Sequence, residues 1–260
     1  MEDTMKKVFL CFFSMFFLLG GVQIGLNAQE AFDQAADDAR VYFLHGVHGG
    51  AIGELPTFPM DIYINGILKI KNAKFGKVVG PKKISPGNTS IDVYRAGEGP
   101  DTGHTPLGEY NFVFKPYENV TIAAYLDADY ESVVQKFNND FSPAGDPSKC
   151  RVIVHNMGVG WISLEFFNKK EPDEGHPMMI AEILEPGDKC VFELAKKTLT
   201  EPHKGEQMAW RLVIGEGADN FIITYNNNFT IKPGKAILVY VVGSYALNTL
   251  KVAKKTAKLQ

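Results

Sequence analysis

The amino-acid sequence predicts an all-β protein made of two tandem antiparallel β-sandwich domains that follow a signal peptide. Short runs rich in β-branched and aromatic side chains recur along the chain, and glycine, proline and asparagine separate them. Two runs occur twice in the same order: ARVYFLHG (39–46) returns as CRVIVHNM (150–157), and NFVFKP (111–116) returns as NFTIKP (228–233). Since repeats of this kind reveal the architecture of a chain, we interpret the sequence as two diverged copies of one domain.

A third pair of similar segments supports the same interpretation. SPGNTSIDVY (85–94) resembles EPGDKCVFEL (185–194), and both place Pro-Gly before an alternating strand. The offset between the copies differs from pair to pair, which is what loop insertions and deletions between retained strands produce.

The N-terminal segment has the layout of a secretory signal peptide. Lys6 and Lys7 precede the apolar run VFLCFFSMFFLL (8–19), and the small residue Ala28 offers a cleavage site before Gln29. We therefore expect residues 1–28 to be removed. No lipobox cysteine follows, which favours a soluble periplasmic or secreted product over a lipoprotein.

The first domain is expected over residues 38–146. Asn65-Gly66 and Pro86-Gly87 are residue pairs that favour tight turns between strands. The strands are expected at 40–45, 60–65, 90–95, 110–115, 120–126 and 132–137.

The second domain is expected over residues 150–260, after a linker, FSPAGDPS (141–148), that is rich in proline, glycine and serine. Six or seven short strands per copy are typical of an immunoglobulin-like sandwich. The strands of this copy are expected at 151–156, 162–167, 190–195, 210–215, 221–226, 236–242 and 249–254.

Composition excludes two classes of partner. The 260 residues carry a formal net charge of −3, so the protein has no global positive field to attract nucleic acid. After the signal peptide, no segment has the roughly 18 apolar residues that a membrane span requires. We expect neither a nucleic-acid partner nor a transmembrane span in the mature chain.

The first copy resembles a family of secreted bacterial β-sandwich repeats of unknown function. The resemblance rests on RVYFLHG, MDIYINGILKI and FGKVVGPKKISPGNTSIDVYRAG, which cover about 100 residues. These motifs are informative about the fold and give almost no information about activity.

The whole mature chain resembles the periplasmic accessory proteins of alginate O-acetylation. The similarity is clearest in CRVIVHNMG (150–158) and IKPGKAILVYVVGSYALNTLKVAKK (231–255). The resemblance implies a non-catalytic helper that assists a membrane-bound O-acyltransferase and its periplasmic partners, through contacts with those proteins or with the exported polysaccharide. The alternative is a secreted or cell-surface structural or adhesive module with no link to acetylation.

The cysteines predict one disulfide. Removal of the signal peptide also removes Cys11, which leaves Cys150 and Cys190 in an oxidising compartment. Both belong to the second copy, so a disulfide between them would stabilise that copy alone. Two separate buried thiols are the alternative.

His45 and His48 are the candidate metal ligands. They are three residues apart in the glycine-rich segment HGVHGG, and Asp61 or His104 could join them. A protein metal site needs three or four convergent ligands, and two histidines in a loop do not supply them. We therefore expect no metal and no other cofactor.

No catalytic residue is expected either. Asp101 and His104 have the spacing of the Asp/His pair in SGNH-type esterases and acetyltransferases, but the chain has no GDS-like serine block before them, and no GxSxG or HExxH. Trp161, which follows GVG at a strand entry, is the candidate for contact with a glycan or a partner. Trp210 starts an alternating strand and is expected in the core.

Overall fold

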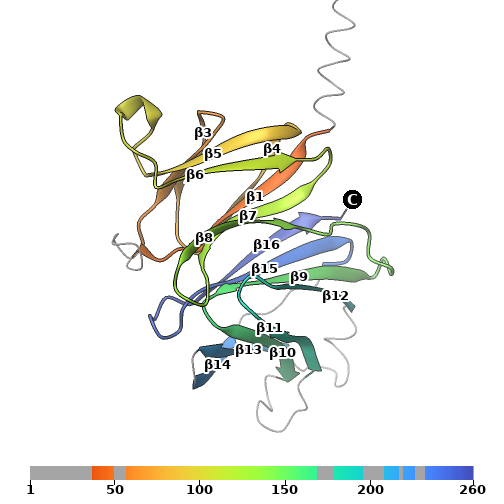
Figure 1. Ribbon diagram of the computed structural model, residues 1–260. Helices are drawn as coiled ribbons and strands as arrows, with labels where there is room; N and C mark the ends of the chain where they lie inside the picture. The colour runs from red at the N-terminus through yellow and green to blue at the C-terminus, as the bar shows by residue number, and fades with distance from the viewer. Residues whose placement is uncertain are drawn as a thin grey trace, which may run out of the picture.

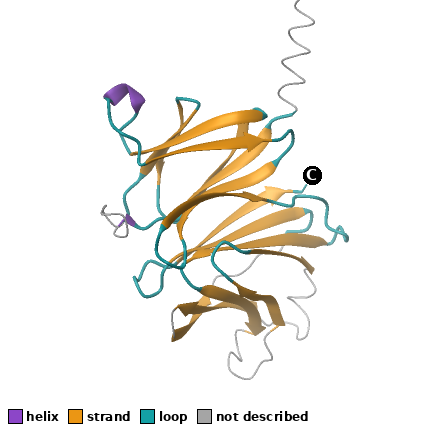
Figure 2. Cartoon of the chain, viewed as in Figure 1, coloured by secondary structure: helices purple, strands orange, loops and turns teal. Residues whose placement is uncertain are grey.

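The computed structural model describes residues 37–49, 57–168, 178–195, 208–216, 219–225 and 232–259. In these ranges the chain forms four four-stranded sheets and no α-helix, which confirms the all-β sandwich class (Figure 2). The predicted signal peptide lies outside the described residues. None of the described residues belongs to a helix that is long and apolar enough to cross a membrane.

The first half of the chain contributes two sheets. Outer sheet 1 has the strand order β3-β2-β5-β6, and inner sheet 1 has the order β4-β1-β7-β8. The strands are β1 (Ala39–His45), β2 (Met60–Ile64), β3 (Ile67–Ala73), β4 (Lys77–Ile84), β5 (Gly87–Arg95), β6 (Gly108–Phe114), β7 (Asn119–Leu126) and β8 (Ser132–Asn138).

The second half contributes the other two sheets. Inner sheet 2 has the order β12-β9-β15-β16, and outer sheet 2 has the order β11-β10-β13-β14. The strands are β9 (Lys149–Gly158), β10 (Trp161–Asn168), β11 (Met178–Leu184), β12 (Lys189–Ala195), β13 (Met208–Glu216), β14 (Asp219–Tyr225), β15 (Lys235–Gly243) and β16 (Lys251–Lys258).

The two halves share one topology, because adding eight to each strand number of the first half gives the strand orders of the second. The register agrees with the repeat found in the sequence. Arg40 pairs with Asn119 and Arg151 with Ala236, and each partner lies four residues after the lysine of its NFxxKP segment.

One pair of similar segments, 85–94 and 185–194, does not occupy equivalent positions in the two halves. Pro86 precedes β5, the fifth strand of the first half, whereas Pro186 precedes β12, the fourth strand of the second half. The similarity between those segments is local. A Pro-Gly turn before a strand is favoured wherever the chain must reverse, because proline fixes one backbone angle and glycine accepts a positive φ, as Gly87 and Gly187 do.

The sheets are mostly antiparallel, with one parallel pair in each inner sheet. β1 pairs in parallel with β7, and β9 pairs in parallel with β15. The first strand of each half is therefore central in its sheet, whereas the first strand of an immunoglobulin domain lies at a sheet edge. The immunoglobulin-like detail of the expectation is not confirmed.

The four sheets stack as layers, with the two inner sheets face to face (Figure 1). One hydrophobic core lies between the sheets of each half, and a third core, the interface core, lies between the two inner sheets. The interface core includes Tyr42, Tyr125, Phe137, Ile153 and Leu238. The two sandwiches are thereby packed directly on each other.

This stacking explains the sequence of the central strands. Every residue of β9 after Lys149 is buried, because Val152 and Val154 point into the core of the second half while Ile153 and Met157 point into the interface core. A strand that is covered on both faces has a continuous apolar run and no alternation of polar residues. The run AILVYVV of β15 has the same cause.

Candidate functional site

A lysine-lined pocket at one edge of the first sandwich is the candidate functional site. It has a volume of about 440 Å³ and lies where the β2–β3 hairpin of outer sheet 1 faces the end of β4 in inner sheet 1. The hairpin turn is the predicted Asn65-Gly66, and both residues have positive φ, 50° and 75°. Because β3 and β4 are edge strands of their sheets, the pocket opens at the side of the sandwich.

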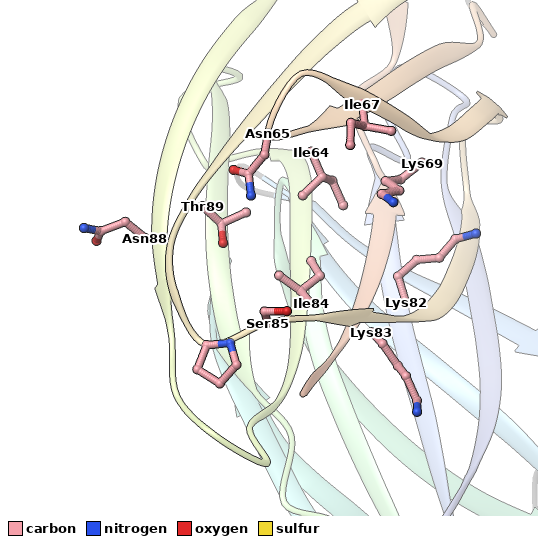
Figure 3. A pocket seen from close by; sticks show the side chains of 11 residues that line it. Ile64, Asn65, Ile67, Lys69, Lys82, Lys83, Ile84, Ser85, Asn88 and Thr89 are labelled. Atoms are coloured by element: carbon pink, nitrogen blue, oxygen red, sulfur yellow. The ribbon is translucent and has the colours of Figure 1, made fainter. Parts of the chain in front are cut away.

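The pocket combines an apolar wall with three lysines. Ile64, Ile67 and Ile84 form the wall, and Lys69 of β3 and Lys82 and Lys83 of β4 carry the positive charge. Figure 3 shows the isoleucines between the lysines on one side and Asn65 and Thr89 on the other. The remaining lining residues are Ser85, Pro86 and Asn88.

The polar groups around the pocket are partly engaged by the protein. Asn65 Oδ1 accepts a hydrogen bond of 2.9 Å from the backbone amide of Ser90, which leaves its side-chain NH₂ group to donate. The hydroxyl of Ser85 donates to Asp38 Oδ1 at 3.4 Å. Among the described residues, none of the three lysines forms an ion pair, and the lining contains no carboxylate.

The structure uses His45 as a core residue. Its side chain is 2% exposed, its Nε2 lies 3.0 Å from the carbonyl oxygen of Phe58, and its ring packs edge-on against Phe58 and Phe75. Burial lowers the pKa of His45 to about 4, so the imidazole is neutral at physiological pH. The ring of His48 lies edge-on against the same Phe75.

The proposed additional ligands do not complete a metal site. Asp61 is buried, and its two carboxylate oxygens accept hydrogen bonds from the backbone amides of Asn72 (2.7 Å) and Gly97 (2.9 Å). These bonds fix the start of the loop that leads to His104. In the part of the chain that the structure describes, no group of three or more His, Cys, Asp or Glu side chains could hold a metal ion.

Asp101 and His104 lie in that loop, beyond the end of β5. Asp101 belongs to a single 3₁₀ turn, Pro100–Thr102, and His104 Nδ1 is 3.6 Å from Glu98 Oε1. The loop is also held by Tyr63, whose hydroxyl donates to the carbonyl oxygen of Glu98 at 3.3 Å. The His104 imidazole is half exposed, and the partner that the structure gives it is a glutamate.

The predicted disulfide between Cys150 and Cys190 is wrong, because both residues are free thiols. They lie on the neighbouring strands β9 and β12, but Cys190 pairs with Val154 and Cys150 pairs with Leu194. Four residues of strand separate the two positions by about 13 Å, beyond the roughly 7 Å between Cα atoms that a disulfide can bridge. Burial raises the pKa of Cys150, and it raises that of Cys190 to about 11. The alternative of two separate thiols therefore applies, one buried and one half-buried.

Trp161 is half-buried at the start of β10. Its ring covers Gly215, the residue opposite it on β13, where an added Cβ would clash with the indole. The glycine thus provides the space that the indole occupies across the strand pair. The side chain of Trp210 lies outside the described residues.

A buried polar network joins the two sandwiches. Asn139, which follows β8, donates to Thr121 Oγ1 at 2.9 Å, and its Oδ1 lies 3.1 Å from His155 Nε2. Thr121 Oγ1 is 2.6 Å from the hydroxyl of Tyr240, and the Tyr240 and His155 rings stack with an interplanar angle of 9°. Burial lowers the pKa of His155 to about 3, so its neutral ring serves as a hydrogen-bonding core residue.

The linker between the sandwiches is fixed by Arg151. The guanidinium lies 2.7 Å from Asp140 Oδ2 and 3.1 Å from Glu193 Oε1, and it also donates to Ser142 and to the carbonyl oxygen of Pro143. Although burial raises the pKa of Asp140, hydrogen bonds from Ser142 and the charge of Arg151 outweigh it and lower that pKa overall.

Comparison with known proteins adds no family. No family model matches the chain, and no curated protein does. One solved structure, a "putative cell adhesion protein" from Bacteroides uniformis ATCC 8492, aligns over 86% of this chain and 98% of its own with 10% identity and a TM-score of 0.27. A TM-score this low carries no argument about function.

Sequence reasoning missed the lysines of the pocket. Lys69 and Lys82 lie in β3 and β4, two strands that the sequence analysis does not predict. The predicted strands therefore gave no reason to expect these lysines near each other. The available signal was the clustering of lysine in ILKIKNA and KVVGPKKI, because lysine and proline are typical of edge strands.

Proposed function

We propose that this protein is a non-catalytic accessory or scaffold protein that acts outside the cytoplasm. In this proposal it assists the O-acetylation of an exported, alginate-like polysaccharide by binding other periplasmic or membrane proteins of the modifying complex, or the polymer itself. The chemistry of acyl transfer belongs to those partners.

The observation that carries the proposal is the direct packing of the two sandwiches. A scaffold must hold its binding surfaces in a constant relative orientation, and the interface core, the polar network and the Arg151 contacts restrain that orientation. Outer sheet 1 and outer sheet 2 lie on opposite sides of the stack (Figure 1). Two partners bound to these sides would be kept at a fixed separation.

The use of the buried ionisable groups supports the same proposal. The side chains of His45, Asp61 and His155 each bind backbone or side-chain groups that shape the fold. Acyl transfer needs a nucleophile in contact with a base and donors placed for the oxyanion, and these three groups serve structural contacts instead.

Deletion of the gene in its own organism tests the proposal. We expect the exported polysaccharide to be made in normal amount but with a reduced acetyl content, measured by NMR of the purified polymer. The full-length gene should restore acetylation, whereas a gene without codons 2–28 should not, because its product stays in the cytoplasm. An unchanged acetyl content together with weaker attachment of the cells to surfaces would contradict the proposal and favour the structural or adhesive alternative.

A further inference from the structure

The lysine-lined pocket has the composition of a binding site for an anionic ligand. Lys69 lines it from β3 and Lys82 from β4, so these positive charges come from two strands in different sheets. Lys83, the next residue of β4, also lines the pocket, but its side chain points away from the isoleucines (Figure 3). Like charges that share a pocket repel one another, and a bound anion relieves this repulsion. Asp38 accepts a hydrogen bond from Ser85, one of the lining residues.

The apolar wall distinguishes this pocket from a simple phosphate site. Ile64 and Ile84 are buried, but Ile67 is 58% exposed. Exposed isoleucine beside lysine suits a ligand that has an apolar face and a negative charge together. A sugar ring with a carboxylate group has both, since its C–H groups form an apolar face.

The polar lining suits the hydroxyl groups of such a sugar. The side-chain NH₂ of Asn65 lies across the isoleucines from the lysines, on the same side as the buried Thr89 (Figure 3). Small-molecule sites commonly combine apolar walls with a few polar groups that orient the ligand, in volumes of about 300–1,000 Å³. The volume of this pocket, about 440 Å³, falls in that range.

We infer that this pocket binds a carboxylate-bearing saccharide, with Lys69 and Lys82 pairing with the carboxylate and Ile67 packing on the sugar ring. The inference rests on the proposed function for the polymer, because a polysaccharide-modifying complex supplies chains of such sugars. It goes beyond that proposal in naming the site and the ligand class. Since the pocket opens at the side of the sandwich, a long polymer can pass across it without threading.

The test is a calorimetric titration of residues 29–260 with a short oligogalacturonate at low salt. The neutral sugar maltohexaose and inorganic phosphate serve as comparison probes. We expect the oligogalacturonate to bind, its affinity to fall as salt is raised, and both comparison probes to bind at least tenfold more weakly. Equal binding of phosphate would show a general anion site, and equal binding of maltohexaose would show that charge is not the basis; either result overturns the inference.

Variants locate the binding. The double substitution Lys69→Gln, Lys82→Gln should weaken oligogalacturonate binding at least tenfold while the circular dichroism spectrum stays that of the wild type. Lys258→Gln with Lys235→Gln is the matched control, because it removes two charges from the paired ends of β15 and β16, and it should change binding less than twofold. A loss of binding in the control pair, or none in the pocket pair, would overturn the assignment.

This experiment and the gene deletion fail independently. Normal acetylation in the deletion strain, together with oligogalacturonate binding that depends on Lys69 and Lys82, would reject the accessory function and retain the site. Lost acetylation together with no binding would retain the accessory function and reject the site.

Discussion

Asn139 is the residue on which the buried network between the sandwiches depends most. Its side chain is 5% exposed, and it binds both Thr121 of inner sheet 1 and His155 of inner sheet 2. Replacing it with alanine removes two buried hydrogen bonds and leaves His155 Nε2 without that partner. A stranded buried polar group costs about 1–3 kcal/mol, and the lost bond to Thr121 about 0.5–1.5 kcal/mol more. We expect Asn139→Ala to lower the free energy of unfolding by about 1.5–4.5 kcal/mol.

Urea unfolding of residues 29–260, followed by tryptophan fluorescence, measures this change. The control is Asn138→Ala, which alters the exposed neighbouring side chain and should change the free energy of unfolding by less than about 0.5 kcal/mol. In a double-mutant cycle with His155→Phe, the combined loss should be smaller than the sum of the two single losses, because no imidazole is then left unpaired. An Asn139→Ala protein as stable as the control, or strictly additive losses, would refute the role of the network.

Three further predictions concern pH, the thiols and the halves of the chain. In the folded state the pKa values of His45 and His155 are about 4 and about 3, so the unfolded state binds more protons below pH 6.5. The free energy of unfolding should therefore fall as the pH is lowered from 6.5 to 4, by up to about 1.4 kcal/mol per pH unit for each histidine. A free energy of unfolding that stays constant over this range in urea titrations would contradict this. Thiol titration of residues 29–260, denatured without reductant, should find two reactive groups per chain, and a result of none would restore the disulfide between Cys150 and Cys190. The fragment 29–146 should bind a hydrophobic dye and self-associate because it exposes its side of the interface core, so a monomeric fragment with full stability would argue against that interface.

The sequence was informative where a strand carries a clear pattern. Alternation and β-branched content located thirteen of the sixteen described strands, among them β5 and β6. The exceptions are β3, β4 and β11, whose sequences are ILKIKNA, KVVGPKKI and MMIAEIL. The first two are lysine-rich edge strands, one with an internal proline, and the third has the methionine, alanine, glutamate and leucine of a helix.

Contacts between distant strands could not be predicted from the sequence. AILVYVV indicated a strand, but no local signal showed that inner sheet 1 covers its second face. The same limit explains the wrong disulfide. The number of residues between Cys150 and Cys190 does not determine the strand register, which pairs Cys190 with Val154. The sequence makes His45 a candidate metal ligand, whereas the carbonyl group beside its Nε2 comes from Phe58, 13 residues further along the chain.

The candidate pocket shows the same dependence on tertiary structure. Asn65-Gly66 predicted the hairpin turn beside it correctly. Lys69 and Lys82 line one pocket because β3 and β4 are the edge strands of two facing sheets. The spacing of residues along the chain does not show which charged side chains two different sheets bring together.

The most direct measurement of the central claim is an acetyl-transfer assay with purified residues 29–260 and an activated acetyl ester. Because the proposed role is that of an accessory protein, we predict no turnover above the blank for the protein alone. Acetylation of polymer should appear when membranes that contain the O-acyltransferase are added, and it should be greater with the protein than without it. Turnover by the protein alone that disappears in His104→Ala would contradict the account, because it would place a catalytic centre in the loop that carries Asp101 and His104.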